Sequence, residues 1–580
     1  MSRLSRVDWA LAVLLLAAAL VPRLQGLDRP SLNTDEVKWI RRGERMIHLF
    51  REGQYRLATA HVSHPGVPAA AAIGFAMQES AWLGLDPVVA ARLPGAIAGA
   101  LVPPLLYLAA APLWGREVAA LAGAFLAVDP RHLATSRTAH IDPLFAVFYL
   151  AALWGFFRHA EADGAVWGVA GGVALGLAEL TRTSGVVAVL TWVTFATVLW
   201  MRSRRRPVTV AELYFAVIAL AVFVALYGKL WLPHGVIPAV NRYPFVPAVE
   251  DAIASASAHR AAWLMAATVL AGFAWRLRRT VSGPLCLLCA CAFASPALAP
   301  DLARNLSGFV MNLATTPHRI HHNYYGGLAP PPGRYLTVLA SGMPLVAFLG
   351  ASIGLPLLAL RSCRDRSRTG DAGLLVVSAV VVFLGVVSPL RKVAFRYLMP
   401  ISPLLALSAA WAWVTVGALL PAAYRRALVA AVAVAAAAVV LPVAPHFAAW
   451  TSTIGSLVRR EAGIVPLLGA DGHDDAALFL WRRAGPGDRV ATFCYDDVLR
   501  FYWHRVLPAR LGEPPKPAPA FGYYRLGDAD FVVWARRGPN LPPTLEEFVS
   551  HRRPDLEVRA LEEVVLRAWD LRAAPAAGRP

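Results

Sequence analysis

Long apolar runs separated by short polar connections occupy most of the chain. From residue 7 to residue 448 these runs recur at about 17–25 residues, and each can cross about 30 Å of hydrocarbon as a helix. The clear candidates are residues 8–26, 92–112, 117–134, 142–157, 165–181, 184–200, 210–231, 260–275, 281–299, 336–360, 372–389, 397–420 and 427–444. The pattern predicts an all-α polytopic membrane protein with about thirteen transmembrane helices.

Mixed, charged sequence replaces the apolar runs after residue 445. A short helix is predicted at Asp474–Ala484, because Gly485-Pro486-Gly487 follows it. Buried strands are predicted at Arg489–Phe493 and Phe531–Trp534, and a longer strand or a hairpin at Val558–Leu571. We therefore expect a transmembrane domain at residues 1–445 and a small α/β domain at residues 446–580.

Arginine clusters indicate which connections face the cytoplasm. By the positive-inside rule they should all lie on that side, and they occupy residues 202–206, 276–279, 361–368 and 425–426. With a cytoplasmic N-terminus, this holds only if the apolar segment 67–84 does not cross the membrane. That segment carries Glu79, and a charge near the middle of a span costs about 2.5–3.5 kcal/mol. We therefore predict that residues 67–84 form a helix in the outer interface.

This topology predicts an extracytoplasmic working face. The first outer loop (residues 27–91) and the C-terminal domain would lie outside, whereas the cytoplasmic side would hold only short basic connections. The Ala- and Arg-rich composition is typical of GC-rich bacterial genomes, so we expect a multi-pass protein of a bacterial cytoplasmic (inner) membrane.

Composition and charge exclude several other classes of protein. The chain is 57% hydrophobic and 16% charged, unlike a soluble domain. Its net charge of +19 comes from arginines beside spans, which favours membrane lipids as partners and no nucleic acid. The five cysteines suggest neither a disulfide framework nor a zinc site, since three of them share one apolar run.

Two adjacent carboxylates, Asp35 and Glu36, open the first outer loop. A carboxylate at the membrane edge can act as a general base toward an acceptor hydroxyl or amine. Two such acids, with Asp142 nearby, could instead hold a divalent cation, so Asp35 and Asp142 are the candidate metal ligands and no other cofactor is expected. A solvated pair of loop acids is the simpler alternative.

A second outer connection, residues 136–143, gathers an arginine, a histidine and an acid. These are Arg137, His140 and Asp142. Asp142 opens the next predicted helix, where an acid also suits the helix dipole, so N-capping is an alternative to a functional role. The three residues lie on the side that carries Asp35.

Cations also occur at the outer ends of later spans. Arg182 and Arg396 run against the positive-inside trend, and binding of an anionic lipid phosphate would explain them. Snorkelling to head groups is the alternative. An outer loop adds His318, His322 and Tyr324, whose irregular spacing favours hydrogen bonds to a phosphate or a sugar over a metal site.

The order of these motifs resembles the GT-C superfamily of membrane glycosyltransferases. More narrowly, it resembles the protein O-mannosyltransferases and lipid A aminoarabinose transferases (glycosyltransferase families 39 and 83). The resemblance runs through N-T-D-E, H-P-G-V-P, S-R-T-A-H-I-D, L-A-E-L-T-R-T-S-G and F-R-Y-L-M-P-I-S-P, and covers about residues 1–445. The chain departs from the families at Gly66, where they favour a second proline, and at Arg182, where they often have a lysine.

The resemblance implies an inverting hexosyl- or pentosyltransferase that uses a polyprenyl-phosphate sugar and an unidentified acceptor. Asp35 would be the catalytic base with Glu36 assisting, and Asp142 would orient the acceptor or complete a cation site. The implied donor-phosphate ligands are Arg137, Arg182, His318, His322 and Arg396. The candidate substrate-binding residues are His64, His140, Tyr324 and Tyr397. A transporter or flippase of lipid-linked precursors is the alternative function, although transporters place their ionisable groups near the midplane.

Overall fold

The computed structural model describes most of the chain. The described residues are 4–29, 31–60, 65–162, 165–203, 210–233, 236, 246–277, 282–311, 334–388, 395–438, 472–493, 496–522, 524–535, 543–560 and 563–572. Every statement about structure below refers to these residues.

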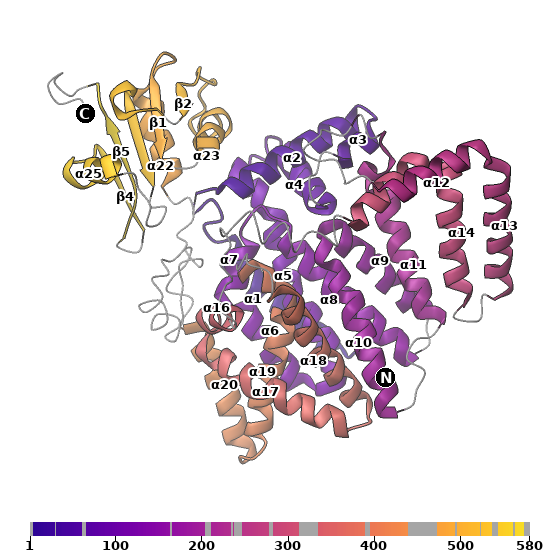
Figure 1. Ribbon diagram of the computed structural model, residues 1–580. Helices are drawn as coiled ribbons and strands as arrows, with labels where there is room; N and C mark the ends of the chain where they lie inside the picture. The colour runs from indigo at the N-terminus through magenta and orange to yellow at the C-terminus, as the bar shows by residue number, and fades with distance from the viewer. Residues whose placement is uncertain are drawn as a thin grey trace.

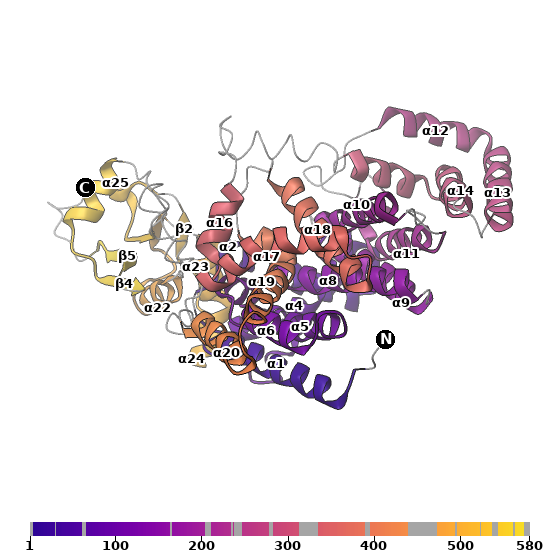
Figure 2. The same ribbon diagram turned by 90° about the horizontal axis from the view of Figure 1, so that it is seen from below.

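A bundle of apolar helices forms the larger part of the molecule (Figure 1). Its helices are α1 (Arg6–Leu24), α5 (Pro87–Trp114), α6 (Arg116–Ala127), α7 (Pro130–Ser136), α8 (Asp142–Ala162), α9 (Ala165–Thr181), α10 (Val186–Ser203), α11 (Val210–Leu226), α12 (Pro247–Ala258), α13 (Arg260–Arg276), α14 (Ser282–Leu298), α16 (Arg334–Gly342), α17 (Leu345–Arg364), α18 (Arg368–Val387), α19 (Ser402–Gly417) and α20 (Ala422–Ala438). Figures 1 and 2 both show α12, α13 and α14 grouped at one side, far from the sheet.

Seven helical segments of the described chain are long and apolar enough to cross a bilayer. They are Arg6–Leu24, Pro87–Trp114, Asp142–Glu161, Thr183–Arg202, Leu345–Arg364, Arg368–Val387 and Phe395–Gly417. Shorter apolar helices cover Val166–Thr181, Phe215–Leu226 and Cys286–Leu298. The prediction of a helical, multi-pass membrane protein is confirmed, whereas the count of thirteen spans stays a prediction.

Small residues allow the bundle helices to approach closely. A Cβ atom on Gly155 of α8 would lie 2.6 Å from the Cα of Gly171 of α9, so the two backbones touch at this point. Close approach at small residues is a main source of helix association in membranes, where burial of apolar side chains adds little. As a consequence, α8 and α9 form a tight antiparallel hairpin that brings the start of α8 near the end of α9.

A layer of three helices lies across one end of the bundle: α2 (Thr34–Arg51), α3 (Tyr55–Ala60) and α4 (Val67–Glu79) (Figure 1). The α4 helix has 13 residues, which gives a length of about 20 Å, well short of the hydrocarbon thickness. A Cβ on Gly43 of α2 would lie 2.6 Å from the backbone nitrogen of Gly74, so α2 and α4 pack backbone to backbone. That residues 67–84 form a helix in the outer interface stays a prediction.

A mixed five-stranded sheet with the order β2-β1-β3-β5-β4 forms the core of the C-terminal part. Its strands are β1 (Arg489–Phe493), β2 (Ala520–Gly522), β3 (Phe531–Ala535), β4 (Leu556–Ala560) and β5 (Glu563–Asp570). Pairing of β1 with β2 and β3 is parallel, and pairing of β5 with β3 and β4 is antiparallel. The accompanying helices are α22 (His473–Arg483), α23 (Asp496–Phe501), the π-helical turn η7 (Tyr502–Val506), α24 (Leu507–Leu511) and α25 (Pro543–His551).

The strands predicted for this region are confirmed, whereas a separate C-terminal α/β domain stays a prediction. The long C-terminal strand is resolved as the β4–β5 hairpin, one of the two forms predicted. The predicted boundary between the domains, near residue 446, lies outside the described residues.

Candidate active site at the end of the helical bundle

The paired acids Asp35 and Glu36 occupy the first turn of α2, directly after the N-cap residue Asn33. Asn33 and Glu36 form a capping box: the Asn33 side chain accepts a hydrogen bond from Glu36 N, and the Glu36 carboxylate accepts one from Asn33 N, both at 3.0 Å. Successive side chains on a helix point about 100° apart. The cap that turns Glu36 into the protein interior therefore leaves the side chain of Asp35 pointing in a different direction. Glu36 is 1% exposed, whereas the side chain of Asp35 is 44% exposed.

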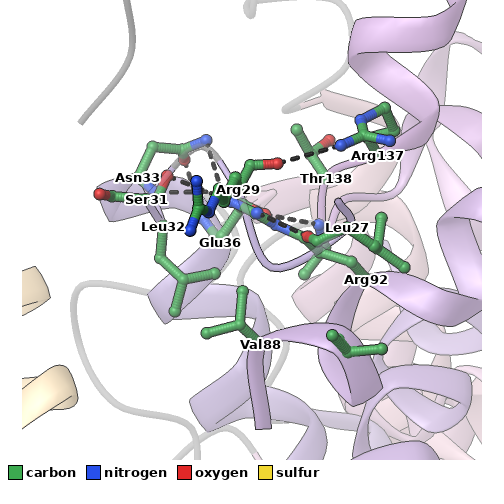
Figure 3. A network of polar contacts seen from close by, with 12 residues as sticks. Leu27, Arg29, Ser31, Leu32, Asn33, Glu36, Val88, Arg92, Arg137 and Thr138 are labelled. Carbon is green, nitrogen blue, oxygen red and sulfur yellow. Dashed lines mark hydrogen bonds and ion pairs between the residues drawn. The ribbon is translucent and has the colours of Figure 1, made fainter. Parts of the chain in front are cut away.

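Arg92 of α5 holds Glu36 in a buried bidentate ion pair (Figure 3). Its Nε and Nη2 donate to the two carboxylate oxygens at 2.8 and 3.0 Å. The same guanidinium donates to the carbonyl oxygens of Leu27 and Ser31 at 3.0 and 3.2 Å. Glu36 also accepts from the backbone nitrogen of Ala139 at 3.0 Å. Glu36 therefore joins α2, α5 and the connection before α8, and this geometry gives it a structural position and no opening toward a substrate.

Arg137 has a similar structural position. It is 3% exposed and donates to backbone carbonyl oxygens at and beyond the end of α1, namely those of Pro22, Arg23, Gln25, Gly26 and Arg29. An arginine suits this place because the last carbonyls of a helix lack partners and carry partial negative charge. Its guanidinium is thus directed at the backbone, and the geometry offers no support for its predicted contact with a phosphate.

Asp35 faces a group of side chains from three other parts of the chain. Its Oδ2 accepts from Nη1 of Arg396 at 2.9 Å. Arg396 lies on the 3-10 helix η4 (Phe395–Ile401), directly before α19. The same Nη1 lies 3.4 Å from Nε2 of His140. Nδ1 of His140 lies 2.7 Å from Oδ2 of Asp142. A continuous chain of polar contacts therefore links Asp35 to Asp142.

Asp142 is completely buried at the start of α8. Its Oδ1 accepts from Nη1 of Arg182, the residue that follows α9. The α8–α9 hairpin explains this pairing, because an antiparallel pair places the first residue of one helix beside the last turn of the other. The predicted alternative of a helix N-cap does not describe Asp142, which is already the first residue of α8.

Tyr397 lies between the two arginines of the site. The guanidinium carbon of Arg182 is 4.4 Å from the centre of its ring, and that of Arg396 is 5.5 Å away. Cation–π contacts of this kind hold both guanidinium groups near one aromatic ring. The structure thus brings six predicted site residues together: Asp35, His140, Asp142, Arg182, Arg396 and Tyr397.

The electrostatic balance of the site favours an anionic ligand. Burial opposes ionisation of Asp35, but the positive charge of Arg396 outweighs it and lowers the pKa of Asp35 below its ordinary value, with His140 and Lys38 contributing. The Nε of Arg396 is buried and makes no hydrogen bond to any described residue. A guanidinium with an unused donor, which shares the ring of Tyr397 with a second cation, Arg182, suits a phosphate.

The described residues do not form a cation site. No group of three or more His, Cys, Asp or Glu side chains among them could hold a metal ion. Both candidate ligands already contact guanidinium groups, Asp35 that of Arg396 and Asp142 that of Arg182. An oxygen-liganded cation would have to displace these like charges.

Four predicted site residues lie outside the described part of the chain: His64, His318, His322 and Tyr324.

The sequence analysis missed one residue of the site, Trp39. The ring of Trp39 meets that of His140 edge-on, with the ring centroids 5.9 Å apart, and the guanidinium carbon of Arg42 lies 4.8 Å from the centre of the Trp39 ring. Trp39 follows Asp35 by four residues on one helix, and this spacing predicts that the two side chains share a face of the helix.

A family model described as dolichyl-phosphate-mannose-protein mannosyltransferase matches residues 72–232. That segment includes His140, Asp142 and Arg182. The match confirms the predicted resemblance to GT-C membrane glycosyltransferases over this segment. No curated protein matches the chain significantly.

The chain is also similar to solved structures of low sequence identity. For the oligosaccharyltransferase of Archaeoglobus fulgidus in the apo form, the TM-score is 0.49 at 16% identity, and the match covers 89% of this chain and 61% of that one, less than two thirds of its length. For ArnT from Cupriavidus metallidurans bound to undecaprenyl phosphate, the TM-score is 0.37 at 16% identity, covering 97% and 98%. For the Pmt1-Pmt2 complex of S. cerevisiae bound to the sugar donor, it is 0.33 at 21% identity, covering 39% and 34%. At these TM-scores the likenesses carry no argument about function.

Proposed function

We propose that the chain is an integral-membrane inverting glycosyltransferase that moves a sugar from a polyprenyl-phosphate donor to an acceptor on the outer face of the membrane. The observation that carries the proposal is the ion pair between the exposed carboxylate of Asp35 and Arg396. A second guanidinium group, that of Arg182, lies against the same tyrosine ring as Arg396. A base and a phosphate site are the two things that such a transfer requires. The family model over residues 72–232 is named for a dolichyl-phosphate-linked mannose, which supports a lipid-phosphate donor.

The reaction is a single displacement at the anomeric carbon. The acceptor oxygen forms a bond to that carbon, the bond from carbon to phosphate oxygen breaks, and polyprenyl phosphate leaves with the electron pair. Asp35 takes the proton of the acceptor. Because the acceptor attacks opposite the phosphate, the configuration at the anomeric carbon inverts.

Arg396 links the two halves of this reaction. Before the donor binds, its positive charge holds the pKa of Asp35 down, which makes the carboxylate a weak base. A donor phosphate that binds Nε and Nη of Arg396 competes for this charge. The pKa of Asp35 then rises, so the base gains strength only when the leaving group is in place.

Asp142 acts through its neighbours in this scheme. Its two carboxylate oxygens meet His140 and Arg182, and it has no exposed surface with which to touch a substrate. We assign it the positioning of Arg182 for the phosphate and of His140 for the acceptor. Tyr397 keeps Arg182 and Arg396 on one side of the site.

The membrane arrangement follows the same proposal. The site lies at the end of the bundle covered by α2 and α4, and we place this end on the extracytoplasmic side of a bacterial cytoplasmic membrane. The cytoplasmic end then carries the basic connections around Arg202 and Arg361–Arg368. We place the domain boundary near residue 446, with the C-terminal domain outside. The sugar is a hexose or a pentose, and the acceptor is a protein, a lipid or a glycan.

The test is turnover by purified protein in detergent with radiolabelled polyprenyl-phosphate sugars. Asp35→Asn should abolish release of polyprenyl phosphate while donor binding persists. Glu52→Gln is the matched control, because it removes an exposed carboxylate from the other end of α2. Full turnover by Asp35→Asn would overturn the assignment of the base. A flippase would move the donor without consuming it, so consumption in detergent also separates the two functions.

A further inference from the structure

We propose that the C-terminal α/β domain positions the catalytic base, by holding the cap segment (residues 31–34) that directly precedes Asp35. This inference rests on the proposed function of Asp35. It assigns a role to a domain whose sequence shows no chemistry of its own, and to three residues of that domain: Asp474, Asp497 and Tyr502.

The contacts between the domain and the cap segment fall on three of its four residues, Ser31, Leu32 and Thr34. The backbone nitrogen of Leu32 donates to the hydroxyl oxygen of Tyr502 at 3.0 Å. The Thr34 hydroxyl donates to Oδ1 of Asp497 at 3.3 Å. The Ser31 hydroxyl donates to the carboxylate of Asp474, the second residue of α22. Three elements of the domain, α22, α23 and η7, therefore meet one short stretch of backbone.

The contact between Leu32 and Tyr502 is completely buried. Both side chains are 0% exposed and belong to one apolar cluster, which continues from α2 and α4 into the sheet domain. A buried backbone N–H without an acceptor is strongly disfavoured, because it has exchanged its hydrogen bond to water for none. The Tyr502 hydroxyl therefore fixes the direction in which the chain enters α2.

The bundle holds the same stretch from the other side. Arg92 donates to the carbonyl oxygens of Leu27 and Ser31 (Figure 3). Two ion pairs fasten the domain nearby, from Arg505 to Glu44 of α2 at 2.5 Å and from Arg510 to Asp86 before α5 at 2.6 Å. The cap segment is thus fixed between two bodies, and neither alone supplies all of its hydrogen bonds.

The position of Asp35 depends on this double attachment. Asp35 follows Thr34 without any intervening residue, and its ion pair with Arg396 spans only 2.9 Å. When the cap segment is freed on the side of the C-terminal domain, the first turn of α2 can move and the ion pair lengthens. A misplacement of about 1 Å can cost a reaction about a hundredfold in rate.

The test uses the full-length protein with two mild substitutions, Tyr502→Phe and Thr34→Val, which remove the hydroxyl groups of the contacts Leu32–Tyr502 and Thr34–Asp497. Each removes one contact to the cap segment while keeping the shape of the side chain. We expect kcat to fall about tenfold to a hundredfold with the KM for the donor nearly unchanged. Trp569→Phe is the matched control, since Trp569 is 1% exposed in a separate cluster of the same domain. Trp569→Phe should lower the thermal stability of the domain and leave kcat unchanged.

A pH–rate profile separates positioning from simple stabilisation. The charged groups that act on Asp35 are Arg396, His140, Lys38 and Arg42. Loss of the contact with Arg396 raises the pKa of Asp35, so the acid limb of the profile should move to higher pH in Tyr502→Phe and stay in place in Trp569→Phe. Unchanged kcat and an unchanged acid limb in both Tyr502→Phe and Thr34→Val would overturn this inference. Full activity of Asp35→Asn would instead overturn the proposed function, so the two failures are distinguishable.

Discussion

Asp35 and Glu36 are neighbours in the sequence, yet their carboxylates lie in opposite environments. Glu36 is buried in a bidentate ion pair with Arg92, and Asp35 reaches out to Arg396 at the mouth of the site. The capping box of α2 sets this division, because it turns Glu36 back toward Asn33. One acid therefore joins the elements that build the site, and the other lies partly exposed within it.

Glu36→Gln should destabilise the protein strongly. The substitution leaves the guanidinium of Arg92 buried without its counter-charge, a situation that typically costs about 3–5 kcal/mol. Thermal unfolding in detergent would measure the change. Glu52→Gln on the exposed end of the same helix should have little effect. Equal melting temperatures for the two variants would contradict the structural role of Glu36.

Arg396→Lys should lower kcat/KM by about a hundredfold to a thousandfold. Lysine keeps the charge but lacks the fork of donors that can serve a carboxylate and a phosphate at once. Steady-state kinetics with the lipid-linked sugar, together with binding of polyprenyl phosphate, would check this. A variant that keeps wild-type kcat/KM would show that no phosphate is held by this side chain.

The activity should depend on pH through Asp35. The folded-state pKa of Asp35 is lowered, so the reactive carboxylate is fully present above its ordinary pKa and is lost as the pH falls through the lowered value. Arg396→Gln removes the main cause of the lowering, and the acid limb of kcat/KM should then move to higher pH. An acid limb that stays in place in this variant would mean that another group sets it.

Gly66→Ala should reduce activity although Gly66 contacts no substrate in the proposed mechanism. A Cβ there would lie 2.2 Å from Cη2 of Trp39, so the indole must move away, and the indole in turn packs on His140. Turnover is the measurement, and Gly272→Ala is the control because its new Cβ would meet nothing within 4 Å. The same contact with Trp39 explains why this chain has a glycine at position 66, where the families that it resembles favour a second proline. Equal turnover by Gly66→Ala and wild type would contradict this coupling.

Chelation should leave turnover unchanged. Asp35 and Asp142 both face guanidinium groups, which supply the positive charge that a divalent cation would otherwise bring. Assays with and without EDTA, followed by addition of Mg²⁺ or Mn²⁺, would check this. Loss of activity that a metal restores would show that a cation site forms outside the arrangement described here.

The residues that meet at the site were predictable because each stands at the end of a span. Asp142, Arg182 and Arg396 all fall at turns on one predicted side of the membrane, so short connections between helices bring them together. The capping pattern of Asn33 and Glu36 was also visible in the sequence and predicts the inward turn of Glu36. Such local signals need no knowledge of the fold.

Other roles depend on contacts between distant parts of the chain. Arg137 has the sequence context of a site residue, but its five carbonyl partners lie at and beyond the end of α1, more than a hundred residues earlier. The contact of Tyr502 with Leu32 spans 470 residues. No periodicity or motif encodes such pairings, because they follow from how whole helices and domains pack.

The backbone contact between Gly155 and Gly171 has a genetic consequence. It lies 13 residues along α8 from Asp142, about 20 Å from the site. Any larger side chain at either glycine pushes α8 and α9 apart, and Asp142 and Arg182 lie at the ends of these helices that form the site. Loss-of-function alleles of this protein are therefore expected deep within the membrane, at positions that a search for reactive residues would pass over.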